Sequence, residues 1–192
     1  MDDSAKRMGE LLLPGSVVGV IAAIAVGGVA LLGGLPAGYV AVAALAIGVP
    51  LSLFGAGYNF LLAKARIRLG GITPAVGYWL VGYTVSRTVH ELAIDAYAGR
   101  PLGFSEGLLA FIAFQLLVSV GFAVGFMWLH EHAAPSWWMR IRDRNPVAAA
   151  YVAAYMEQAA YTEQQKQKGK RERAAKQRNA PRSSPKKARA RS

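Results

Sequence analysis

The sequence contains no cysteine among its 192 residues. Disulfide bonds, thiolate nucleophiles, iron–sulfur clusters and cysteine-type zinc sites are therefore excluded. The chain also lacks three common catalytic patterns, the GxSxG nucleophile elbow, the HExxH zinc motif and the P-loop. These absences lead us to expect a protein that is not an enzyme and that binds no cofactor.

Charge is missing from two long stretches of the chain. No Asp, Glu, Lys, Arg or His occurs between Leu11 and Ala63, and none occurs between Gly107 and Leu129. Because about 20 apolar residues span the hydrocarbon core of a bilayer, the first stretch is long enough for two crossings and the second for one. The sequence therefore predicts an all-α membrane protein.

Four transmembrane helices are expected, at residues 14–32, 39–58, 75–98 and 105–129. The Gly- and Pro-rich residues between the first two helices turn the chain there, and Pro50 is expected to kink the second helix. Residues 1–13 are expected to form a short cytoplasmic N-terminus. The apolar run after them is interpreted as a retained first span, because it is longer than the core of a signal peptide.

The orientation in the membrane follows from the basic residues. If the third segment crosses, Lys64, Arg66 and Arg68 lie on the same side as both termini, and Arg100 lies opposite. The positive-inside rule then places both termini in the cytoplasm. An arginine near the bilayer centre, Arg87, costs about 3 kcal/mol and is the main argument against this crossing. We expect an integral protein of a prokaryotic plasma membrane.

The third predicted helix carries several ionisable side chains. At helical spacing, Arg87, Glu91 and Asp95 share one face, and His90 lies beside them. Folding the fourth helix back about a turn near its start would bring Gln115 level with Arg87. Because polar side chains commonly hold membrane helices together, we expect an intramembrane polar network of these residues, in which Arg87 pairs with Glu91.

A proton or ion route is the functional alternative for this network, since intramembrane ionisable groups often mark such routes. A metal or haem site is not expected. The same fold-back separates His90 from His130 by about 27 Å. His130 and His132 point to different sides of a helix and do not converge on one ion.

Two GxxxG pairs occur in the predicted spans, Gly15 with Gly19 and Gly121 with Gly125. Small residues at this spacing let two helices approach closely in a membrane. We expect both pairs to serve packing within the chain rather than a dimer interface.

Residues 130–162 are predicted to form an interfacial segment followed by an amphipathic helix, with Asn145 as its cap and Pro146 at its first turn. Side chains suited to the lipid headgroup level occur in the segment, namely Trp137, Trp138, Arg140, Arg142 and Arg144. The helix carries an apolar stripe that needs a neighbour, consisting of Tyr151, Val152, Tyr155 and Met156. That neighbour is the membrane surface, the underside of the bundle or another protein.

The net charge of +11 is concentrated at the C-terminus, where residues 163–192 hold twelve Lys and Arg against two Glu. This segment has no large apolar residue, so disorder is expected. Its expected ligands are anionic lipid headgroups. A ribosome or RNA is the alternative, although the segment has no aromatic side chain on which bases can stack.

By elimination, the sequence suggests a non-catalytic accessory or assembly subunit of a larger membrane complex, such as respiratory or translocation machinery. Its partners would then be other membrane protein subunits. Two alternatives stay open. One is a small proton- or ion-coupled transporter that uses Arg87, His90, Glu91 and Asp95, and the other is an insertase-like or ribosome-tethered factor that uses the basic tail.

Overall fold

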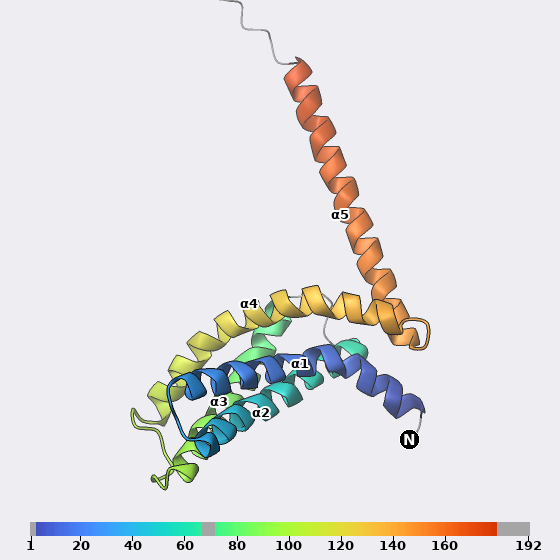
Figure 1. Ribbon diagram of the computed structural model, residues 1–192. Helices are drawn as coiled ribbons and strands as arrows, with labels where there is room; N and C mark the ends of the chain where they lie inside the picture. The colour runs from blue at the N-terminus through green and yellow to red at the C-terminus, as the bar shows by residue number, and fades with distance from the viewer. Residues whose placement is uncertain (1–2, 67–71, 180–192) are drawn as a thin grey trace, which may run out of the picture. The chain divides into compact units, whose positions relative to one another are not determined.

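The computed structural model describes residues 3–66 and 72–179, and all regular structure within them is helical. Five helices follow one another along the chain (Figure 1): α1 (Asp3–Leu32), α2 (Ala37–Ala63), α3 (Ile72–Tyr97), α4 (Leu108–Ile141) and α5 (Pro146–Asn179). Helices α1 to α4 and the start of α5 form one compact unit, and the chain from Ala153 forms a second.

Three of these helices, α1, α2 and α4, are long and apolar enough to cross a membrane. This finding supports the prediction of a helical membrane protein for three of its four expected spans. The remaining expected span, at residues 75–98, corresponds to α3, which has a similar length of 26 residues. Its charged side chains make it less apolar than the other three.

The ends of the helices differ from the predicted spans. Helix α1 begins at Asp3 rather than Pro14, and α4 continues to Ile141. Proline has no N–H, so Pro14 leaves the carbonyl of Glu10 without its helical donor. The indole N–H of Trp137 donates to that carbonyl at 2.7 Å. Because this acceptor is satisfied from α4, the helix can pass through the proline.

The contact between α1 and α2 depends on glycine. A Cβ atom at Gly15 would collide with the carbonyl oxygen of Gly55, and one at Gly19 would collide with the backbone of Ser52. The hydroxyl of Ser52 also donates to the carbonyl of Ser16 at 3.0 Å. As predicted, the first GxxxG pair is used for close packing within the chain.

The second GxxxG pair behaves differently. A Cβ atom at Gly121 or Gly125 would have no described atom within 4 Å. Both glycines lie on an exposed face of α4. The prediction that this pair also packs within the chain is therefore wrong for the described residues.

Helices α2, α3 and α4 alternate in direction. Asn59 near the end of α2 contacts His130 in the second half of α4. At the opposite end, the ring of Tyr39 at the start of α2 lies 6.1 Å from that of Tyr97 at the end of α3. Helix α3 therefore runs the full length of the bundle, from the end where α2 stops to the end where α4 begins.

The prediction of disorder from Glu163 is wrong as far as Asn179, where α5 ends. This part of the chain consists mainly of Gln, Lys, Arg, Glu and Ala, which have high helix propensities. These propensities favour a helix even where large apolar residues are missing. Arg68 and residues 180–192 lie outside the described residues.

Candidate functional site

The polar residues of α3 form a chain of contacts around Arg87. Its Nη1 donates to Nδ1 of His90 at 2.7 Å, and its Nη2 lies 3.5 Å from a carboxylate oxygen of Glu91. Arg87 can only donate, so Nδ1 of His90 accepts and the ring is neutral with its proton on Nε2. The ion pair with Glu91 is long and about one third exposed, which makes it a weak pair.

Asp95 does not join this chain of contacts, because it pairs with Arg100 instead. Nε of Arg100 donates to one carboxylate oxygen of Asp95 at 2.8 Å, and Nη2 forms an ion pair with the same oxygen at 2.7 Å. The end of α3 produces this geometry. Gly99 adopts a left-handed backbone with φ of 65°, and the N–H of Arg100 donates to the carbonyl of Asp95 at 2.9 Å. This Schellman-type helix end returns Arg100 over the last turn.

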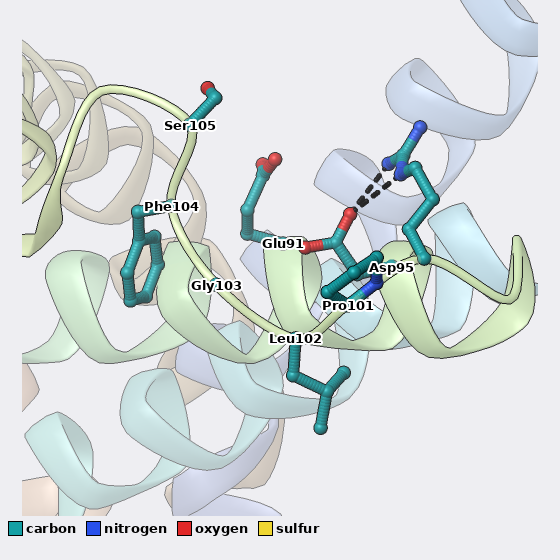
Figure 2. Close-up of a pocket in the computed structure, with 8 residues that line it drawn as sticks. Glu91, Asp95, Pro101, Leu102, Gly103, Phe104 and Ser105 are labelled. Atoms are coloured by element: carbon teal, nitrogen blue, oxygen red, sulfur yellow. Dashed lines mark hydrogen bonds and ion pairs between the residues drawn. The ribbon is translucent and has the colours of Figure 1, made fainter.

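A cavity of about 610 Å³ opens beside these ion pairs. Figure 2 shows Glu91 and Asp95 on one face of α3, with the loop from Pro101 to Ser105 passing next to them. The lining holds two carboxylates and the guanidinium of Arg100. Its formal charge is negative, so it suits water or a small cation better than an anion.

Gln115 is buried, but it makes no hydrogen bond to Arg87 or Glu91 in the described part of the chain. The hydrogen bond expected between Gln115 and Arg87 is therefore not formed. Ring contacts keep the pairing of α3 with α4 within about one turn of the expected fold-back, because Trp79 contacts both Phe122 and Phe126.

A layer of aromatic rings separates this site from the other end of the bundle. The ring of Trp79 in α3 lies 4.8 Å from that of Phe122 and 4.5 Å from that of Phe126 in α4. Tyr58 of α2 adds a third contact, 5.0 Å from Phe126. These rings fill the space between the helices with large apolar groups.

A second polar cluster lies on the other side of the aromatic layer. The side-chain amide of Asn59 donates to the carbonyl of Leu11 at 2.9 Å, and its oxygen lies 2.8 Å from Nε2 of His130. Because that oxygen accepts, the proton of His130 is on Nε2. The cluster joins α1, α2 and α4. This cluster was not predicted from the sequence, although Asn59 is the most polar side chain in the first uncharged stretch.

Trp137 and Trp138, which were predicted to lie at the lipid headgroups, make contacts within the chain. Trp138 is fully buried, so the prediction that it contacts headgroups is wrong. Because α4 continues without a break, Trp138 lies on the same face as His130, and their rings are 5.6 Å apart. Trp137 is half-buried and held by its bond to Glu10.

The three predicted arginine anchors are exposed. Arg144 pairs with Glu10 at 3.0 Å, and Arg142 lies 3.5 Å from Asp143. Asn145 follows them, and its amide donates to the carbonyl of Arg7 at 2.8 Å. These contacts fix the corner between α4 and α5 against the first turns of α1.

Only part of the apolar stripe at the start of α5 packs against the chain's own bundle. Val152 is buried, and the ring of Tyr151 lies 4.7 Å from that of Trp138. Burial raises the pKa of Tyr151 to about 12, so its hydroxyl is protonated at neutral pH. For these two residues the neighbour is the chain's own bundle rather than a partner. Met156 is exposed and Tyr155 is half-buried.

Within the described residues, no three His, Asp or Glu side chains converge on a possible metal position. Comparison with protein-family models, with curated proteins and with solved structures gave no match.

The Asp95 pair should matter more for stability than the Arg87 pair. Replacing Asp95 by Asn removes a charge that accepts two short bonds, and we expect a loss of about 1 kcal/mol after allowing for the exposure of Arg100. Glu91→Gln, the matched control, should cost less because its pair is longer. Thermal unfolding in one detergent compares the two variants, and a larger loss for Glu91→Gln would contradict the assignment.

Proposed function

We propose that the protein is a non-catalytic accessory or assembly subunit of a larger membrane complex, and that the exposed face of α4 binds a helix of a partner subunit. The observation that carries this proposal is the unused glycine pair of α4. Only 17% of the residues in its most apolar stretch are buried within the chain. Gly121 and Gly125 lie in this stretch with open space before them.

The partner-binding face of α4 comprises Leu117, Gly121, Val124, Gly125 and Trp128, which recur at helical spacing and are all exposed. In lipid there is little hydrophobic drive for helix association, so small residues that allow close backbone contact become important. The chain already uses this device where Gly15 of α1 meets Gly55 of α2. The α4 face offers the same kind of surface to another helix.

A transporter is less well supported by the geometry. The polar groups near the α3–α4 loop and the cluster around Asn59 are separated by the rings of Trp79, Phe122 and Phe126. A proton or ion route needs polar groups or water across this layer. The contacts of the first group lie within α3 and the turn after it, whereas the Asn59 cluster joins α1, α2 and α4. Both groups are thus accounted for as structural contacts.

We further propose four crossings with both termini in the cytoplasm, in a prokaryotic plasma membrane. The course of α3 through the full length of the bundle supports its crossing beside α2 and α4. Lys64 and Arg66 lie at the bundle end near Arg144, whereas Arg100 lies at the opposite end. The positive-inside rule assigns the first end to the cytoplasm, where exposed Arg140 and Arg142 can meet anionic headgroups.

Leucine at both Gly121 and Gly125 should block a partner helix without disturbing the fold. The new side chains meet open space within the chain but fill the gap that close backbone contact requires. We expect the tagged double variant to lose most of its co-purifying partner in mild detergent, as measured by quantitative mass spectrometry and native gels. Its thermal midpoint should stay near that of the wild type.

The control for this experiment is Gly28→Leu in α1, which also enters open space but lies outside the α4 face. It should retain the partner. If the double variant kept the same partner at the same stoichiometry, the α4 face would not be the binding surface.

The orientation can be tested because the chain has no cysteine of its own. Single cysteines at Leu35, Lys64 and Ser105 sample the three connections between consecutive helices of the bundle. With an impermeant maleimide on intact cells, Leu35→Cys and Ser105→Cys should react, and Lys64→Cys should react only after lysis. Equal labelling of Lys64→Cys and Ser105→Cys on intact cells would show that α3 does not cross.

A further inference from the structure

The second half of α5 is strongly basic. Between Glu163 and Asn179 it carries seven Lys and Arg against two Glu. The basic side chains described there, at Lys166, Lys168, Lys170, Arg171 and Arg173, are all exposed. A helix with this excess of positive charge needs a polyanion or counterions around it.

The charges do not lie on one face. Successive residues of an α-helix are about 100° apart, so Lys166 and Lys170 share one side of the helix. Lys168 and Arg171 lie together on the opposite side. Beyond Tyr161 the helix also has no large apolar side chain. It therefore lacks the apolar face by which an interfacial helix is buried in a bilayer.

Because the positive charges lie on more than one side of the helix, they favour one kind of polyanion, folded RNA, over another, a membrane surface. A membrane surface is flat and meets one side of a helix, so only part of the charge would be used. The grooves of folded RNA present phosphates on more than one side. We propose that the second half of α5 binds the phosphate backbone of structured RNA. The second half of α5 has no aromatic side chain beyond Tyr161 on which bases could stack, so binding is independent of base sequence.

This inference goes beyond the accessory function and does not rest on it, because it uses α5 and not the α4 face. The two can therefore fail separately. A chain that keeps its membrane partner but does not bind RNA would overturn only the assignment of α5.

The test uses the full chain in phosphatidylcholine nanodiscs and a fluorescein-labelled RNA hairpin, with binding followed by anisotropy. The logarithm of the affinity should fall linearly with the logarithm of salt concentration, with a slope of about −4 to −6, as expected when several basic residues release counterions. A scrambled hairpin of equal length should bind equally well.

Variants can separate the contribution of the positive charges to RNA binding from that of the helical structure. Replacing Lys168, Lys170, Arg171 and Arg173 together by Gln keeps good helix formers, and should weaken binding at low salt at least tenfold and flatten the salt slope. The matched control removes two negative charges instead, by Glu163→Gln with Glu172→Gln, and should strengthen RNA binding. Gly169→Pro leaves every charge in place but breaks the helix, and should weaken binding several-fold, whereas Gly169→Ala should not.

Three results would overturn the proposal. The first is the absence of RNA binding at low salt, and the second is equal binding by Gly169→Pro and the wild type. The third is a preference for vesicles of phosphatidylcholine with phosphatidylglycerol over the hairpin at the same salt concentration, which would assign α5 to the membrane surface.

Discussion

The side chain of Asn59 provides the interaction on which the bundle most depends. It lies in a stretch of more than fifty uncharged residues, where an unpaired amide would be costly. Its N–H satisfies the carbonyl of Leu11, and its oxygen accepts from His130. One buried side chain thereby links α1, α2 and α4, and the buried ring of His130 in turn packs against Trp138 near the start of α5.

The proline of α1 extends this linkage. Because Pro14 cannot donate to the carbonyl of Glu10, that acceptor is available to Trp137 of α4. The carboxylate of Glu10 pairs with Arg144 at the following corner. The first turns of α1 are thus held by α4 and the corner after it, through one freed backbone carbonyl and one carboxylate. At the opposite end, the pair of Asp95 and Arg100 fixes the turn that follows α3.

Local patterns in the sequence were enough to predict some of this structure. The uncharged stretches predicted α1, α2 and α4, and helical spacing predicted that Arg87 lies next to Glu91. The partner of Asp95 depends on the backbone at Gly99, which residue spacing along the helix does not reveal. The pair of Asn59 and His130 joins residues far apart in the chain, so only the folded arrangement of three helices could identify it.

The Asn59 cluster and the aromatic rings connect the helices of the bundle, and we propose that the exposed face of α4 binds another helix. The central claim is that this face is occupied in the native membrane. The most direct measurement is the mass and subunit composition of the wild-type chain after mild extraction, by native mass spectrometry. The account predicts one larger assembly in which the chain occurs at a fixed ratio to other membrane subunits. A single 20.5 kDa species, or an assembly of this chain alone, would contradict it.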